Sequence, residues 1–296
     1  MEPSILADYG DLCGECPIWD VAQRMLYWTD CVGQQLHRYR DGKHETIKRG
    51  LEINGFRLNE AGGFTIGNNS GIWWWDGAEL VKPIATEVDG CKCQMNDCTA
   101  DPAGRFIGGT NYYNPAGGYP LGKLVQINTD GRASIIDEGF QLSNGFGFSP
   151  DGRTMYFTDS AAHKIYAYDY DPATGAARNR RTFVDVPVAE GVPDGLSVDQ
   201  QGFVWSAQWF GSRVVRYDPD GREERRIAVP AKQTSSLTFG GPDMTDIFIT
   251  SAGRSEAMPE MPPGYDAVNG HFGGELFTVN LGIAGKPEFR TRLPIP

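Results

Sequence analysis

The sequence predicts an all-β protein folded as a six-bladed β-propeller. One phrase, in which a turn leads into a short apolar or aromatic strand with a small polar end, recurs along the chain and is clearest as SPDGRTMYFTDS at 149–160. Its copies lie about 40–50 residues apart, which is the length of a propeller blade of four short strands. No stretch of the sequence has a sustained helical period. The three observations together favour repeated antiparallel sheets over any helical fold.

Six copies of this phrase follow one another along the chain. Close copies begin at Asp101 and Asp199, and looser copies begin at Asp20, Asn59 and Gly241. The residues that directly precede the strands are Gln23, Gly62, Gly104, Gly152, Gly202 and Met244. Successive members of this set are 39, 42, 48, 50 and 42 residues apart. We therefore predict six blades.

Each repeat contains a second, alternating strand that ends in a turn. Examples are residues 36–42, 124–131, 165–175 and 214–221. Asp-Gly and Pro-Asp turns separate these strands, which is typical of antiparallel sheet. The 22 residues before the first marker and the 52 after the last are enough for the two ends to complete one shared blade. We therefore expect residues 1–296 to form a single domain.

One position of the repeat should line the axis of the propeller. The innermost strand of each blade faces the central channel, so residues at the same phase of each repeat gather there. Eight residues before the six markers stand Glu15, Asn54, Asn96, Asn144, Asp194 and Ser236. Taken singly, Asn144-Gly145 and Asp194-Gly195 read as ordinary turns. Taken as a ring, the carboxylate and amide oxygens predict one divalent cation in the channel, with Ca²⁺ as the first expectation and Zn²⁺, Mn²⁺, Mg²⁺ or Fe²⁺ as alternatives.

Composition and charge exclude several classes of function. The net charge of −11 argues against a nucleic-acid partner, because phosphate binding needs a face rich in Lys and Arg. No apolar run approaches the roughly eighteen residues that span a bilayer, and the first residues lack the pattern of a secretory signal. We expect a cytoplasmic protein without a membrane partner. The sequence also lacks a G-x-S-x-G motif and a Gly-rich phosphate loop.

All six cysteines lie in the first third of the chain, at positions 13, 16, 31, 91, 93 and 98. The spacings of Cys13 with Cys16 and of Cys91 with Cys93 match a zinc site only in part, and no pair of histidines accompanies them. We interpret the set as reduced thiols, some of them near a site.

At the axial residues the sequence resembles the SMP-30/gluconolactonase/LRE family, which includes regucalcin and bacterial sugar lactonases. The matching segments are GECPIW (14–19), MNDCTADPAGRFIGGT (95–110), LSNGFGFSPDG (142–152), PDGLSVDQQGFVW (193–205), TSSLTFGGPDMTDIFITSA (234–252) and GGELFTVN (273–280). The resemblance covers essentially the full chain. It implies a six-bladed propeller that holds one divalent cation in its channel and hydrolyses sugar-acid lactones.

The resemblance also implies roles for particular residues. Glu15, Asn144 and Asp194 would be metal ligands, and Asp194 would also serve as the catalytic base. Asn96 would contact the substrate, and it would reach the metal only through a water molecule. Many members carry an Arg two residues before this Asn, whereas this sequence has Gln94, which would bind substrate as an uncharged amide.

The loop from 111 to 122, NYYNPAGGYPLG, stands where many members carry a Glu that is absent here. Its Tyr112, Tyr113 and Tyr119 are candidates to stack on the face of a sugar. The alternative is that the loop is merely an ordered turn.

The function that we expect is metal-assisted hydrolysis of a cyclic ester, with an aldonolactone of the gluconolactone type as the small-molecule partner. One alternative keeps the metal site in a propeller esterase or phosphotriesterase. A second is a non-catalytic propeller that binds calcium or a protein, and a third is a degenerate member in which Gln94 marks lost catalysis. We expect a monomer or a weak oligomer.

Overall fold

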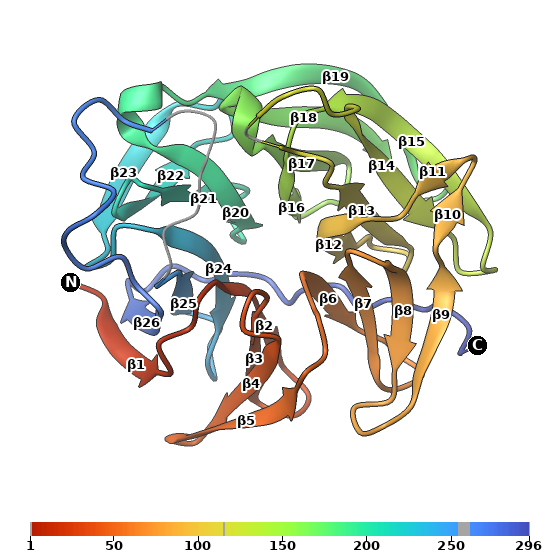
Figure 1. Ribbon diagram of the computed structural model, residues 1–296, viewed down its shortest axis with the longest axis horizontal. Coiled ribbons are helices and arrows are strands. Elements are labelled where there is room, and N and C mark those ends of the chain that lie inside the picture. Colours follow the sequence, from red (N-terminus) through yellow and green to blue (C-terminus); the bar gives the residue numbers. More distant parts are fainter. Residues whose placement is uncertain (1, 115, 254–260, 296) are drawn as a thin grey trace.

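Six four-stranded antiparallel sheets surround a central axis in the computed structural model, which describes residues 2–114, 116–253 and 261–295 (Figure 1). The first two blades are β2 (Gly14–Asp20), β3 (Met25–Asp30), β4 (Gln35–Arg40) and β5 (Lys43–Arg49), then β6 (Gly55–Leu58), β7 (Phe64–Asn68), β8 (Gly71–Trp75) and β9 (Val81–Ala85). The next two are β12 (Met95–Ala100), β13 (Phe106–Thr110), β14 (Gly122–Ile127) and β15 (Ala133–Phe140), then β16 (Ser143–Phe148), β17 (Thr154–Asp159), β18 (Lys164–Asp171) and β19 (Ala176–Asp185). The fifth is β20 (Val192–Val198), β21 (Val204–Trp209), β22 (Arg213–Tyr217) and β23 (Glu223–Ala228). The all-β, six-bladed prediction is confirmed.

The sixth blade is assembled from both ends of the chain. Its strands are β24 (Thr234–Gly240), β25 (Asp246–Ser251), β26 (Glu275–Asn280) and β1 (Ser4–Asp8). β1 pairs with β26 in antiparallel register, with Ser4 opposite Thr278 and Asp8 opposite Glu275. The N-terminal strand therefore closes the ring, as the lengths of the two ends predict.

Few elements lie outside the blades. A two-stranded ribbon, β10 (Glu87–Val88) with β11 (Cys91–Lys92), precedes the third blade, and two 3₁₀ turns, η1 (Ser160–Ala162) and η2 (Val188–Glu190), follow β17 and β19. In the described part of the chain, no helix is long and apolar enough to cross a membrane.

Large apolar side chains fill the space between blades. Trp28, Trp75 and Trp205 are fully buried, and each belongs to a separate cluster of buried side chains. Of the three consecutive tryptophans on β8, Trp74 and Trp75 are buried and Trp73 is partly exposed. Successive side chains of a strand point to opposite faces, so both faces of β8 are covered by packing here. This packing fixes the inner strands that carry the axial residues.

Five of the six inner strands are bulged near their start. The irregular positions are Glu15–Ile18 on β2, Met95–Cys98 on β12, Asn144–Phe146 on β16, Pro193–Leu196 on β20 and Thr234–Ser236 on β24. A bulge bends a strand and re-aims its side chains. Five of the six axial residues, all except Asn54, therefore sit at or beside the places where the inner strands leave regular geometry.

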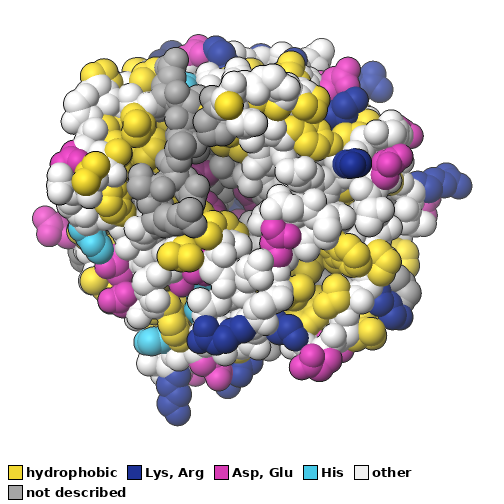
Figure 2. All heavy atoms as spheres, in the orientation of Figure 1, with side chains coloured by type: hydrophobic (Ala, Val, Ile, Leu, Met, Phe, Trp, Pro, Cys, Tyr) yellow, Lys and Arg dark blue, Asp and Glu magenta, His cyan; other side chains and the backbone are white. Residues whose placement is uncertain are grey.

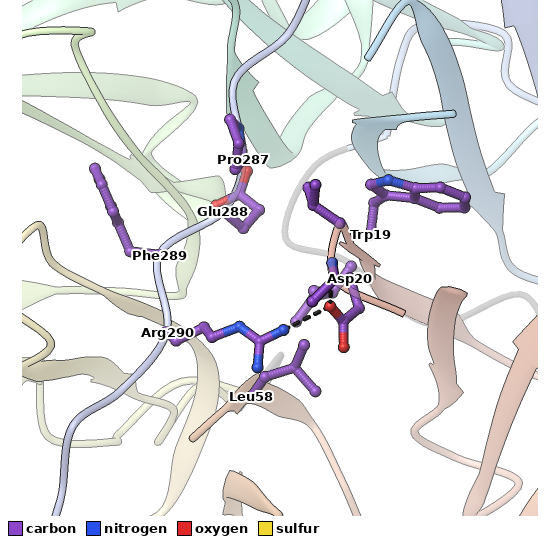
Figure 3. A pocket seen from close by; sticks show the side chains of 10 residues that line it. Trp19, Asp20, Leu58, Pro287, Glu288, Phe289 and Arg290 are labelled. Atoms are coloured by element: carbon purple, nitrogen blue, oxygen red, sulfur yellow. Dashed lines mark hydrogen bonds and ion pairs between the residues drawn. The ribbon is translucent and has the colours of Figure 1, made fainter. Parts of the chain in front are cut away.

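The C-terminal segment covers the opposite end of the channel, where the inner strands finish. Gln200 donates to the Ala284 carbonyl (3.0 Å), the Thr291 amide donates to the Leu58 carbonyl (2.9 Å), and Arg292 donates to Gly104 (2.7 Å), so this segment joins three blades. A cavity of about 270 Å³ lies beside it. Figure 3 shows the side chains that line this cavity, among them Asp20 in an ion pair with Arg290. This cavity contains none of the axial residues.

Candidate active site

A cavity of about 250 Å³ opens where the inner strands begin. Acidic side chains are visible in a hollow near the centre of the face drawn in Figure 2. Five of the six axial residues line this cavity, namely Glu15, Asn54, Asn96, Asn144 and Asp194. The fold therefore brings together residues that are as far as 179 positions apart in the sequence. Ser236, the sixth, lies beside the site, because a Cβ built on Gly195 would be 2.2 Å from its hydroxyl.

Two glycines hold Asn144 and Asp194 close to the neighbouring blades. Gly145 has φ +25°, and a Cβ there would be 2.4 Å from the Asp194 carbonyl oxygen. A Cβ on Gly195 would likewise be 2.2 Å from the Ser236 hydroxyl oxygen. Both glycines lie inside strands, β16 and β20, so the interpretation of these Asn-Gly and Asp-Gly pairs as turns is wrong. The small residue is needed for close approach between blades instead.

The amide side chains of the ring bond to the next blade. Asn54 Nδ2 donates to the Met95 carbonyl and Asn96 Nδ2 donates to the Ser143 carbonyl, each at 2.9 Å. These bonds orient each amide so that its oxygen is left to accept a hydrogen bond. Asn54 and Asn96 therefore combine a structural contact with a free acceptor at the cavity.

The carboxylates of the site are held in an unfavourable environment. Asp194 is 3% exposed, and its buried Oδ1 has no hydrogen-bond partner. Burial, followed by the charges of Glu15 and Asp97, raises the pKa of Asp194 well above its usual range. Burial and the charge of Asp97 likewise raise the pKa of Glu15 to about 8. Buried carboxylates that repel one another without a counter-charge are costly, so this arrangement is suited to a cation.

The donor atoms suit a hard divalent cation. Glu15 and Asp194 offer carboxylate oxygens, and Asn144, which lines the same cavity, offers an amide oxygen. Over the described ranges no three His, Cys, Asp or Glu side chains are arranged to hold a metal ion. The candidate set differs from such a group because its third member is an asparagine.

The tyrosine loop is divided between two cavities. Tyr113 lines the site and packs edge-on against Tyr119 at 5.3 Å between ring centroids. The Tyr112 hydroxyl lies 3.2 Å from the Cys91 thiol and donates to the Lys92 carbonyl, at a neighbouring cavity.

Gln94 is joined to the loop through its backbone carbonyl, which accepts a hydrogen bond from the Asn111 amide (2.7 Å). Gln94, Tyr112 and Tyr119 do not line the site, so their roles in substrate binding stay predictions, and position 115 of the loop lies outside the described residues.

Comparison with known proteins shows the family of this chain. Residues 13–253 match the family described as SMP-30/Gluconolactonase/LRE-like region. The chain belongs to this family. The resemblance inferred from the axial motifs is confirmed.

Relatives of this SMP-30/gluconolactonase chain match it over nearly its whole length. Pentonolactonase XacC of Haloferax volcanii is 35% identical over 284 residues, 94% of each chain. A 6-deoxy-6-sulfogluconolactonase of Pseudomonas putida is 35% identical over 88% of each chain. The crystal structure of regucalcin from Agrobacterium tumefaciens, named as a calcium-binding protein, is 25% identical, covers 99% of this chain and 98% of its own, and has a TM-score of 0.85.

Reasoning from the sequence missed several residues of the site. Asp97 lines the cavity next to Asn96, because the bulge of β12 lets two consecutive side chains turn toward the axis. Asn111 and Trp209 also line it. The Asn96-Asp97 pair at the start of an inner strand was a signal for Asp97. Nothing in the repeat phase selects Trp209, which lies at the end of β21.

Proposed function

We propose that this protein is a divalent-metal-dependent lactonase that opens sugar-acid lactones by attack of water on the lactone carbonyl carbon. The observation that carries the proposal is the convergence of Glu15, Asn144 and Asp194 on one cavity, with a buried and unpartnered carboxylate oxygen on Asp194. Two relatives at 35% identity are named as lactonases of sugar acids, which supports the same class of substrate here.

Glu15, Asn144 and Asp194 would hold the cation. When bound, a divalent cation supplies Lewis-acid polarisation of the carbonyl and stabilises the negative charge that develops on its oxygen. The rest of the chemistry belongs to side chains of the chain.

Asp194 is the proposed general base. Its carboxylate takes a proton from the attacking water, whose oxygen forms the new bond to the carbonyl carbon. The bond from that carbon to the ring oxygen then breaks, and the ring oxygen leaves as a hydroxyl after it receives the proton. The single product is the open-chain hydroxy acid.

Asn54, Asn96 and Tyr113 are proposed to position the substrate. The two amide oxygens left free by the bonds to Met95 and Ser143 accept hydrogen bonds from sugar hydroxyls. The Tyr113 ring lies at the same cavity and offers an apolar face to the sugar. This mixture of amide acceptors and an aromatic ring favours a polyol over an aryl ester or a phosphotriester.

A pH-indicator assay on a panel of aldonolactones tests the proposal. The protein is first stripped with a chelator, and Ca²⁺, Mn²⁺, Zn²⁺, Mg²⁺ or Fe²⁺ is then restored one at a time. The panel includes pentonolactones and hexonolactones. We expect turnover to vanish with the chelator and to return with at least one cation. Stoichiometric cation binding without turnover of any lactone would overturn the proposal in favour of a calcium-binding propeller.

A further inference from the structure

Cys13, directly before β2, and Cys31, directly after β3, lie opposite each other in the first blade. Gly14 is paired with Asp30 in the register of β2 and β3, so Cys13 and Cys31 are the next residues opposite one another, and the Cys31 amide donates to the Cys13 carbonyl at 3.0 Å. Directly opposed residues of an antiparallel pair have Cα atoms about 4.5–5.5 Å apart. This spacing falls inside the range that a disulfide can bridge.

The two thiols are already in contact. Cys31 packs against the buried cluster that contains Cys13, and the neighbouring Cys31 thiol together with burial raises the pKa of Cys13 well above its usual range. Both thiols are free, and both line the cavity that holds Glu15 and Asp194. Cys31 is half-buried, whereas the other five cysteines are buried, so Cys31 is the thiol open to a solute in the cavity.

Asp30 holds the backbone on both sides of this pair. Its buried carboxylate accepts from the Leu12 and Cys13 amides at 3.0 Å and from the Gly33 amide at 2.8 Å. A Cβ at Gly33 would be 2.1 Å from the same carboxylate, so the turn is built around it. The two thiols are therefore kept in register without any disulfide.

We propose that Cys13 and Cys31 form an oxidisable dithiol in the wall of the candidate active site, which a hydroperoxide converts into a disulfide. The Cys31 sulfur attacks one oxygen of the hydroperoxide and breaks the O–O bond, which gives a sulfenic acid and, from hydrogen peroxide, one water. The Cys13 sulfur then displaces that hydroxyl, which leaves as a second water when the S–S bond forms. The two thiols lose two electrons in total, and the peroxide bond accepts them.

The disulfide is expected to disturb the site. Its S–S length of about 2.05 Å is much shorter than a contact between two thiols, so the side chains must move toward each other. Cys13 packs with Val192 and Trp209, and it lies two residues before Glu15. The oxidised form should therefore lose activity, an effect that rests on the proposed lactonase function, whereas the disulfide itself does not.

The other thiols provide internal controls. Cys16 accepts a hydrogen bond from Arg57 (3.2 Å) and is buried beneath the site. Cys91 contacts Tyr112 at the neighbouring cavity. Neither thiol is opposite a second cysteine in a strand register.

The test is peroxide treatment of the reduced full-length protein, followed by alkylation, trypsin and mass spectrometry. Cleavage after Arg24 separates Cys13 from Cys31, so a disulfide appears as two joined peptides that are lighter by two hydrogen atoms, and fragment spectra distinguish Cys13 from Cys16. We expect this joined species, and a loss of kcat/KM of about a hundredfold, as for a misplacement of about 1 Å, that dithiothreitol reverses. Cys31→Ser should keep its own reduced-state activity after peroxide, and Cys91→Ser should remain as sensitive as the wild type.

Two results would overturn the inference. One is oxidation of Cys31 to sulfinic acid without formation of the joined peptides, which would show that Cys13 and Cys31 do not form a disulfide. The other is formation of the disulfide with unchanged lactone turnover, which removes its effect on the site. If the joined peptides form in a protein that turns over no lactone even when reduced, the dithiol stands and the proposed function fails.

Discussion

Gly145 lies against the backbone of Asp194, so that a Cβ atom at position 145 would be 2.4 Å from the Asp194 carbonyl oxygen. The fourth and fifth blades therefore touch at the point where each presents a proposed metal ligand. Asn144 and Asp194 line the same cavity on either side of this contact. The geometry of the site thus depends on a residue that has no side chain of its own.

Gly145→Ala is expected to weaken cation binding as well as folding. The new Cβ must push the two inner strands apart, and strained or overpacked positions of this kind cost about 1–3 kcal/mol. Isothermal titration with Ca²⁺ and thermal unfolding of the chelated protein measure the two effects. Gly42→Ala is the control, because Gly42 also has a positive φ but a Cβ there meets nothing within 4 Å. Equal cation affinity in both variants would contradict the role given to this contact.

Asp194→Asn should abolish most turnover while the propeller remains folded. The substitution removes the proposed base, and general base catalysis contributes roughly 10²–10⁴-fold. Because burial and neighbouring charges raise the pKa of Asp194, burying this carboxyl group costs stability at neutral pH, and the neutral amide should therefore stabilise the chelated protein against heat. The measurements are kcat with saturating cation and the unfolding temperature with chelator. Full activity in a folded Asp194→Asn protein would exclude the assignment.

Glu15→Gln should act mainly on the cation. The variant keeps the size of the side chain but cannot ionise to offer a carboxylate to the cation, so cation affinity should fall, and excess cation should restore part of the turnover. A titration of activity against cation concentration measures this shift. An unchanged titration midpoint would remove Glu15 from the ligand set.

The tyrosines of the 111–122 loop should differ in their effect on KM. Tyr113 lines the site, whereas the Tyr112 hydroxyl is engaged by the Lys92 carbonyl at another cavity. We expect Tyr113→Ala to raise KM for an aldonolactone several-fold more than Tyr112→Ala, with kcat the less affected parameter. Steady-state kinetics on both variants provide the comparison. Equal effects of the two substitutions would contradict the different roles given to Tyr112 and Tyr113.

The phase of the repeat predicted both the ring of blades and most of the site. Because every inner strand starts at the same end of the channel, one offset was enough to select Glu15, Asn54, Asn96, Asn144 and Asp194. The same offset could not reveal that Asn54 and Asn96 also join neighbouring blades, since those bonds depend on the distance between sheets.

Loop residues were predicted less well than strand residues. Three tyrosines within eight positions look equivalent in the sequence, but the path of the loop sends Tyr112 away from Tyr113. Trp209 enters the site from the end of β21, a position that no repeat pattern marks. These placements are decided by contacts between segments that are distant in sequence.

Arg216→Met is expected to destabilise the protein without entering the site. Arg216 is buried with Asp199, to which its guanidinium donates two hydrogen bonds, at 2.9 and 2.6 Å. Loss of one partner leaves a buried charge unpaired, which costs about 3–5 kcal/mol. Urea unfolding of the variant measures this cost. Asp199→Asn combined with Arg216→Met should recover part of it, and a double variant as unstable as the single one would show that the charge of Asp199 is not the cause.

Glu224 makes the stability of the fifth blade sensitive to acid. Hydrogen bonds from Arg225 and then Arg216 lower the pKa of Glu224 to about 2, below its usual value of about 4.5. A carboxyl group whose pKa is lower in the folded state contributes stability that is present above the unfolded pKa, and that contribution is lost as the pH falls from about 4.5 toward 2. Glu224→Gln should therefore lower the unfolding temperature at pH 7 and make it fall less steeply between pH 5 and pH 3. The side chain is about one-third exposed, so solvent screening keeps the effect small, and a matched series of melting curves for wild type and variant is the measurement. Parallel curves at all pH values would mean that Glu224 has no net interaction with the two arginines.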